Sequence, residues 1–304
     1  MAVMTSSLPV SGVNPGSRLL TQPPQSRYLL YSKGRTAVFS CEADPRASFC
    51  LYIPSTHPVE RLYKGESIGN FDSTFPLVVL IHHAGLNGQS LRDDWSEWAE
   101  NHQCVVLSPM FPYSFRGLTF AKDDEFADYY KYMKDPDPSN PVRYDLLLLD
   151  MVETASREWG FIETDRFCLA GYSAGGQASY RFWYLHPERL RAIAIGAPGS
   201  LTRIDSAPWP AGCGNTNNLF GISVSHAALA RAQTKVQILL GEKDTGRRDA
   251  LTPSRPEIID GIAADLDQAG MQYERVSVPG VGHDDGIKPS TVFQQDFIAK
   301  HLRC

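Results

Sequence analysis

The chain has 304 residues, of which 42% are hydrophobic and 21% are charged. This composition is typical of a globular protein that buries a sizeable core, and it excludes disorder over the whole length. The formal net charge is -5 and the basic residues are scattered, so we do not expect nucleic acid as a partner. The chain does not start with a basic segment followed by an apolar one, and nowhere do eighteen apolar residues run together. We therefore expect a cytoplasmic protein that does not bind membranes.

Residues 1–26 are rich in Ser, Pro and Gly and show no apolar periodicity, so we predict a flexible extension there. The remaining residues, 27–304, are predicted to form a single domain. Two β-rich stretches, residues 36–41 and 49–53, surround a turn at Asp44-Pro45 and predict an antiparallel hairpin at a sheet edge.

Short apolar runs then alternate with helical patterns. The runs lie at residues 77–81, 105–107, 167–170, 192–195 and 236–240, and a last strand is predicted at 274–278. Helices are predicted at residues 91–101, 145–159, 176–185, 225–232 and 256–269. Continuous apolar strands that alternate with helices indicate a parallel sheet covered on both faces, hence a doubly wound α/β fold. Two long segments, 109–143 and 198–235, interrupt this alternation, and we expect them to form caps over a site.

A Gly-x-Ser-x-Gly motif directly follows the predicted strand at 167–170. It reads Gly171-Tyr172-Ser173-Ala174-Gly175, and a helical pattern comes after it. A sharp strand-to-helix turn holds serine in a strained conformation, and the flanking glycines avoid collisions with the neighbouring elements. The motif therefore predicts that Ser173 is a nucleophile above the sheet.

A serine nucleophile needs a base, and the base needs an acid that orients it. Asp244 follows the predicted strand at 236–240, and His283 follows the last predicted strand. Both fall at carboxyl ends of strands, where open α/β sheets place their sites. Glu242 and Asp249 are the rival acids. We expect no catalytic role for the other histidines outside the oxyanion loop; His57, His102, His186 and His301 are predicted at surface or loop positions and His226 at the start of a cap helix.

An acyl-transfer site also needs two N–H donors for the oxyanion. We predict that the backbone of Ala174 supplies one and that of Ala84, with Gly85 as the rival, supplies the other. His82 and His83 could instead suggest a metal pair. Adjacent residues that leave a strand point apart, however, and no third ligand is evident, so we expect no metal.

The six cysteines show no spacing typical of a metal site. Cys104 and Cys168 lie in or beside apolar runs, and buried thiols are the expectation. Cys41 and Cys50 could alternatively form a disulfide in an oxidising compartment.

The segments around the site residues read LVVLIHHAGLNG, GYSAGG, GEKD and PGVGHDD. Through them the chain resembles the α/β-hydrolase superfamily, and within it the esterase, depolymerase and dienelactone-hydrolase-like branch. The resemblance implies an α/β-hydrolase fold, with a mostly parallel eight-stranded sheet, helices on both faces and cap or lid insertions. It also implies ester hydrolysis without a cofactor. The chain departs from the family's pattern at His82-His83, where His-Gly is common, and it also resembles fungal hydrolases encoded beside polyketide pathways.

The first functional hypothesis is a serine hydrolase that cleaves a carboxylic ester or thioester through an acyl-serine intermediate. One alternative is an acyltransferase or cyclase of secondary-metabolite biosynthesis that uses the same triad, and another is a non-catalytic ligand-binding protein. The aromatic residues of the two insertions predict an apolar or aromatic small-molecule substrate. The residues predicted to contact it are Leu86, Tyr172 and Trp209.

Overall fold

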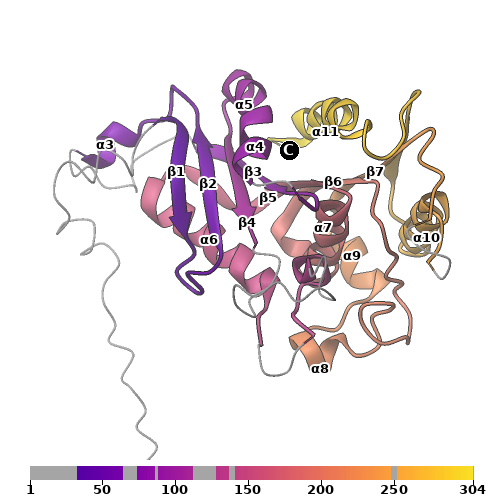
Figure 1. The fold of residues 1–304 in the computed structure, drawn as a ribbon. Coiled ribbons are helices and arrows are strands. Elements are labelled where there is room, and N and C mark those ends of the chain that lie inside the picture. The colour runs from indigo at the N-terminus through magenta and orange to yellow at the C-terminus, as the bar shows by residue number, and fades with distance from the viewer. Residues whose placement is uncertain are drawn as a thin grey trace, which may run out of the picture.

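The computed structural model describes residues 33–63, 74–85, 88–111, 128–136, 141–247 and 252–303. The predicted extension at 1–26 lies outside these residues. Within the described chain, eight strands form one sheet in the order β1-β2-β4-β3-β5-β6-β7-β8 (Figure 1). The strands are β1 Gly34–Ser40, β2 Ser48–Ile53, β3 Phe75–Ile81, β4 Val105–Met110, β5 Ile162–Tyr172, β6 Leu190–Gly196, β7 Lys235–Gly241 and β8 Tyr273–Val278.

Strand β2 is antiparallel to both of its neighbours, β1 and β4, and every other pair of neighbouring strands is parallel. The predicted edge hairpin and the predicted mostly parallel sheet are therefore confirmed. To form the next parallel strand, the chain must run back from the carboxyl end of one strand to the amino end of the next. Helices provide these crossover connections.

The helices cover both faces of the sheet. They are α3 Val59–Tyr63, α4 Gly88–Asp94, α5 Ser96–His102, α6 Tyr144–Trp159, α7 Ala174–Leu185, α8 Thr216–Phe220, α9 His226–Ala232, α10 Arg255–Gln268 and α11 Ile287–His301, with 3-10 turns η2 Tyr129–Tyr132 and η3 Pro187–Arg189. Side chains of α6, α7, α9 and α10 belong to one buried cluster, and those of α5 and α11 to a second cluster on the other face. Figure 1 shows α5 and α11 on one side of the strands and α6 and α7 on the other.

Alternation along the strands divides the core between these two clusters. Leu77, Val79 and Ile81 of β3 pack with the first, and Val78 and Leu80 pack with the second. All seven residues of β3 are buried. A strand covered on both faces reads as a continuous apolar run for this reason.

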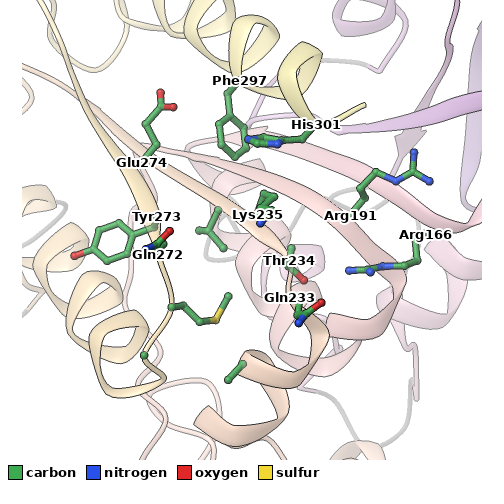
Figure 2. A pocket seen from close by; sticks show the side chains of 14 residues that line it. Arg166, Arg191, Gln233, Thr234, Lys235, Gln272, Tyr273, Glu274, Phe297 and His301 are labelled. Atoms are coloured by element: carbon green, nitrogen blue, oxygen red, sulfur yellow. The ribbon is translucent and has the colours of Figure 1, made fainter. Parts of the chain in front are cut away.

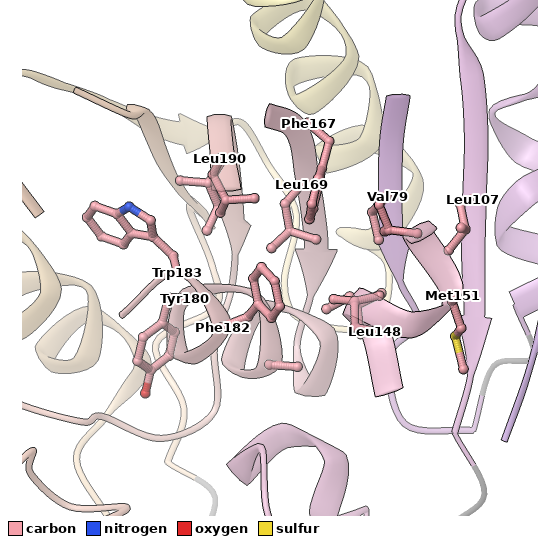
Figure 3. Packing of buried hydrophobic residues seen from close by; sticks show 14 of the residues in the cluster. Val79, Leu107, Leu148, Met151, Phe167, Leu169, Tyr180, Phe182, Trp183 and Leu190 are labelled. Atoms are coloured by element: carbon pink, nitrogen blue, oxygen red, sulfur yellow. The ribbon is translucent and has the colours of Figure 1, made fainter. Parts of the chain in front are cut away.

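Helix α7 is central to the first cluster, because all twelve of its residues are buried. Figure 3 shows Phe182 of this helix facing Phe167 and Leu169 of strand β5, and the ring centroids of Phe182 and Phe167 lie 6.0 Å apart. Each fully buried side chain of this size contributes about 1.5–3 kcal/mol relative to an exposed one. This packing fixes the helix that follows Ser173.

The predicted helix at 91–101 is divided into α4 and α5, and the buried Trp95 lies between them. Helix α11 was not predicted. Only four of its fifteen residues are buried, and two of these, Ser290 and Gln294, are polar. Its apolar periodicity is therefore too weak to be recognised in the sequence.

The two predicted caps contact each other where the structure describes them. Trp209 Nε1 donates a hydrogen bond of 2.8 Å to the carbonyl of Tyr132, and the guanidinium of Arg143 lies 4.7 Å from the ring centroid of Phe220. Phe220 also packs edge-to-face on Trp209, with ring centroids 5.1 Å apart. The described parts of 109–143 and 198–235 therefore pack as one layer beside α7. Arg181 of α7 donates a 2.8 Å hydrogen bond to the carbonyl of Lys131 and so connects this layer to the helix.

The five cysteines within the described residues are buried free thiols, and Cys41 and Cys50 are not bridged. The expectation of buried thiols is confirmed for these five. A membrane-spanning helix would have to be longer and more apolar than any found in the described part of the chain.

Candidate active site

Ser173 occupies the turn between β5 and α7 in a strained backbone conformation, with φ 55° and ψ -115°. Few non-glycine residues adopt such angles, which cost about 1–3 kcal/mol. The turn is held because the Ser173 N–H donates to the Gly196 carbonyl at 2.9 Å, and the Gln177 N–H donates to the Ser173 carbonyl at 3.0 Å. The surrounding structure therefore keeps the serine in this position.

The two glycines of the motif lie where a side chain would collide with backbone. A Cβ on Gly171 would stand 2.3 Å from the carbonyl oxygen of Gly175, and a Cβ on Gly175 would stand 2.1 Å from that of Ile81. The start of α7 thus lies directly against the end of β3. This close approach brings the loop after β3 beside Ser173.

Three predicted residues meet at the carboxyl ends of parallel strands. His283, after β8, lies with Nε2 3.0 Å from Ser173 Oγ and with Nδ1 2.7 Å from Asp244 Oδ2. Asp244, after β7, has a side chain only 2% exposed, whereas that of His283 is 22% exposed. The contacts match an Nδ1–H that donates to the carboxylate and an Nε2 that accepts the serine proton.

The rival residues lie elsewhere. Glu242 accepts a 2.8 Å hydrogen bond from the Gly280 N–H and so fastens the loop after β8, and Asp249 lies outside the described residues. His186 contacts Asp145 at 2.8 Å, and His226 contacts Asp265 at 3.4 Å. Neither of these contacts involves Ser173. His57 and His186 lie in loops, as predicted, and both are buried rather than at the surface.

The two predicted oxyanion donors lie on either side of the contact between β3 and α7. Ala174 is the first residue of α7 and is buried. Ala84 and its rival Gly85 form an exposed turn, in which Gly85 has φ 81°. His83 Nδ1 lies 2.7 Å from the Ala84 carbonyl. Which backbone N–H receives the oxyanion stays a prediction.

His82 has a structural place beside this turn. Its side chain is 4% exposed, and its Nε2 accepts a 3.3 Å hydrogen bond from the Phe111 N–H. The hydroxyl of Tyr130 donates to the His82 carbonyl at 2.9 Å. Burial lowers the pKa of His82 to about 4, so the imidazole is neutral near pH 7. Among the described residues, neither His82 nor any other side chain belongs to a group of three that could bind a metal ion.

The residues predicted to contact a substrate have mixed positions. The Tyr172 hydroxyl donates to the His283 carbonyl at 2.7 Å, and the two rings lie 5.4 Å apart. Burial raises the pKa of Tyr172, so this hydroxyl keeps its proton. Trp209 packs between the two insertions, as described above, and Leu86 lies outside the described residues. Their roles in substrate binding stay predictions.

Two side chains that support the site were not predicted. Gln294 of α11 is buried and donates to the carbonyls of Gly171 at 3.0 Å and Ala194 at 3.3 Å, which joins β5 and β6 beneath the serine turn. Arg255 of α10 lies 3.3 Å from Asp244 Oδ1. The Ser254-x-x-Glu257 capping pattern marks the start of α10, and it is the one sequence signal that could have placed Arg255 near the sheet edge.

A cavity of about 920 Å³ lies at the other end of the strands, away from the triad (Figure 2). Arg191, Lys235 and Tyr273 line it at the amino ends of β6, β7 and β8. None of the predicted site residues lines this cavity. Because ligands of open α/β sheets bind at the carboxyl ends of the strands, the cavity is not the candidate active site.

The fold and the serine turn together define the class: the chain has the α/β-hydrolase fold. No family model matches the chain, and no curated protein does. Among solved structures it is similar to poly(aspartic acid) hydrolase-1 from Sphingomonas sp. KT-1, with a TM-score of 0.64 and 20% identity over 87% of this chain and 98% of that one. It is also similar to a poly(3-hydroxybutyrate) depolymerase from Bordetella parapertussis, with a TM-score of 0.63 and 19% identity over 91% and 94% of the two chains. An S-formylglutathione hydrolase from Agrobacterium tumefaciens has a TM-score of 0.61 and 14% identity over 88% and 94%. The predicted α/β-hydrolase fold is confirmed.

Proposed function

We propose that the protein is a serine hydrolase that cleaves a carboxylic ester or thioester through an acyl-Ser173 intermediate. One observation carries this proposal: Ser173 Oγ, the His283 imidazole and the Asp244 carboxylate form a continuous chain of contacts of 3.0 and 2.7 Å. The strained turn presents the hydroxyl at the start of α7, where backbone N–H groups favour a developing negative charge.

In the acylation step, His283 Nε2 takes the proton of the Ser173 hydroxyl while Oγ attacks the carbonyl carbon of the substrate. Asp244 holds the imidazole in the required tautomer and stabilises the imidazolium. The oxyanion receives hydrogen bonds from the Ala174 and Ala84 backbone. The tetrahedral intermediate then collapses as His283 Nε2 returns the proton to the leaving alcohol or thiol.

In the second step, His283 removes a proton from water, and the resulting oxygen attacks the acyl carbon of the ester on Ser173. Collapse breaks the bond between that carbon and Oγ, and the serine takes the proton back from Nε2. The products are a carboxylic acid and a free serine. The cycle uses only side chains and backbone groups of this chain and water.

The substrate is proposed to carry an apolar or aromatic acyl or alcohol portion. The described aromatic residues of the insertions support this, because the Tyr130 hydroxyl bonds the His82 carbonyl and so holds one insertion against the loop proposed to bind the oxyanion. Rates on a series of esters with short charged, medium alkyl and aromatic acyl groups test the proposal. Equal rates across the series would contradict it.

Covalent labelling by a fluorophosphonate probe tests the mechanism, since such probes react with activated serines. We expect a single adduct on Ser173 and none in the Ser173→Ala variant. The absence of an adduct in a folded sample would rule out the hydrolase and the acyltransferase alike and leave the ligand-binding alternative. If an adduct forms, product analysis in water separates hydrolysis from transfer to another acceptor in secondary-metabolite biosynthesis.

A further inference from the structure

The carboxylate of Asp244 has a nitrogen partner on each of its oxygens. Its Oδ2 receives His283 Nδ1 at 2.7 Å, and its Oδ1 lies 3.3 Å from Arg255 Nη1. The Asp244 side chain is 2% exposed, so water contributes little to its solvation. A buried carboxylate needs polar partners for both oxygens, and Arg255 supplies the second one.

Arg255 is held firmly in this position. It is the first residue of α10, and the preceding Ser254 forms a capping box with Glu257. The Arg255 N–H donates to the Gly246 carbonyl at 3.1 Å, which returns the chain to the loop that carries Asp244. The side chain is 17% exposed. Its Nε is buried and makes no hydrogen bond with a described residue, so Asp244 is the charged partner that offsets the desolvation of this guanidinium.

The other charged side chains that the structure describes around this pair are exposed. Glu242 and Lys243 lie on the loop after β7, and Asp284 and Asp285 follow His283 on the loop after β8. Tyr172 faces His283 from the end of β5, and its hydroxyl is engaged by the His283 carbonyl. Water screens exposed charges strongly, whereas a charge of low exposure acts over a similar distance with much less screening. Among the described residues, Arg255 is therefore the permanently charged side chain with the strongest effect on Asp244.

We propose that Arg255 is a positioning residue of the triad: its guanidinium pairs with one oxygen of the Asp244 carboxylate and holds the other oriented toward His283, and its positive charge acts on the imidazole across that carboxylate. The inference rests on the proposed function. Its consequence is tested by removing the charge, since the guanidinium and a protonated imidazole share one carboxylate and repel each other. The cost is weaker stabilisation of the imidazolium that forms in each step.

The test is the pH dependence of Ser173 labelling by the fluorophosphonate probe, measured between about pH 4.5 and 8.5 in the full chain. For Arg255→Gln we expect the plateau rate to fall about tenfold, because Asp244 is less well oriented. The pH at which the rate reaches half its plateau on the acidic side should rise by about one unit, because the opposing charge is gone. Arg255→Lys should restore the acidic half-point but only part of the rate, since an ammonium lacks the planar guanidinium geometry.

Arg247→Gln is the matched control. Arg247 lies on the same loop, is exposed and pairs with Glu257 at 3.1 Å, without touching Asp244. It should leave the plateau and the acidic half-point unchanged. Thermal unfolding of each variant establishes that it is folded, and if Arg255→Gln does not fold, Arg255→Lys carries the test through its lowered plateau at an unchanged half-point.

The outcomes separate the two proposals. A wild-type protein that does not label at Ser173 overturns the proposed function. A wild-type protein that labels, together with an Arg255→Gln variant whose acidic half-point stays or falls, overturns the inference alone. A fall is the result expected if Arg255 only props the loop, because Asp244 would then move away from His283 and support its protonation less.

Discussion

His57 is a buried titratable residue whose described contacts do not involve the triad. It lies between the rings of Phe75 and Phe161, with centroids 4.8 and 5.8 Å away, and its side chain is fully buried. Burial lowers its pKa to about 4, and a backbone interaction with Gly160 opposes this only in part. The folded protein therefore keeps His57 neutral at a pH where the unfolded chain, with an ordinary histidine, is already protonated.

This difference predicts acid-dependent stability. Between pH 6.5 and pH 4 the unfolded state binds more protons, so the free energy of unfolding falls as the pH falls, by about 3 kcal/mol for His57 alone at pH 4. His57→Leu removes the titrating group and should make the pH dependence shallower by about that amount. Urea unfolding at pH 7.5 and at steps down to pH 4.5 measures it.

The measurement at pH 7.5 serves as the internal control, because His57 is neutral in both states there and any change reports packing alone. A His57→Leu variant that loses stability toward acid as steeply as the wild type would contradict the prediction. His82 is lowered to about the same pKa and would then be the main source of the acid sensitivity.

At the level of single residues, the sequence predicts the triad more fully than its support. Ser173, Asp244 and His283 each follow a segment that can be recognised as a strand, and the carboxyl ends of parallel strands meet. Arg255 follows a loop whose path depends on tertiary packing, so its contact with Asp244 cannot be predicted. The place of Tyr172 in the motif predicts a substrate contact. Its hydroxyl donates to a backbone carbonyl on another loop, and no sequence pattern indicates that hydrogen bond.

Helix α7 and strand β3 meet through a glycine, and this contact predicts the effect of a one-carbon change. A Cβ on Gly175 would lie 2.1 Å from the Ile81 carbonyl oxygen, a backbone atom that cannot move without the strand. We expect Gly175→Ala to destabilise the protein by more than about 3 kcal/mol, or to prevent folding, because the helix must shift away from the sheet. Chemical denaturation of the purified variant measures the loss.

Gly246→Ala is the matched control, because the one described atom within 4 Å of its Cβ would be Arg255 Nη1, at an ordinary 3.8 Å. It should change the free energy of unfolding by less than about 1 kcal/mol. Equal stabilities for the two variants would show that the start of α7 is loosely packed, contrary to the close approach described above.

Elements with strong apolar patterns were predicted, and elements fixed by tertiary contacts were not. Strands β3 to β8 and helices α6, α7, α9 and α10 correspond to predicted segments, and the largest difference is at β5, which begins at Ile162 rather than at Phe167. Helix α11 was missed because it buries few residues, although its Gln294 supports the serine turn. The break between α4 and α5 was missed because Trp95 continues the apolar pattern through it.

Across the whole molecule, the insertions share the core of the sheet. Cys213 and Phe220 of the second insertion belong to the same buried cluster as Leu169 and Ile193 of the central strands. Arg181 of α7 ties that insertion to the sheet layer through a 2.8 Å bond to Thr202. Because they share this core, we expect the insertion and the sheet to unfold as one cooperative unit. The prediction of a single domain over residues 27–304 can therefore be tested as cooperative unfolding of the sheet and the insertion.

Thiol labelling tests this cooperativity, because the described cysteines are distributed over the sheet and the second insertion. Burial raises the pKa of Cys50 to about 11 and that of Cys213 to about 12, so neither is reactive in the folded protein. In a Cys304→Ser background we expect no labelling under native conditions apart from that through global unfolding, with Cys50 and Cys213 modified at rates within about threefold of each other. Peptide mapping of samples quenched over time gives the two rates. Labelling of Cys213 at least about tenfold faster than that of Cys50 would show that residues 198–235 open separately from the sheet, and a cap that opens in this way would be a second unit rather than part of one domain.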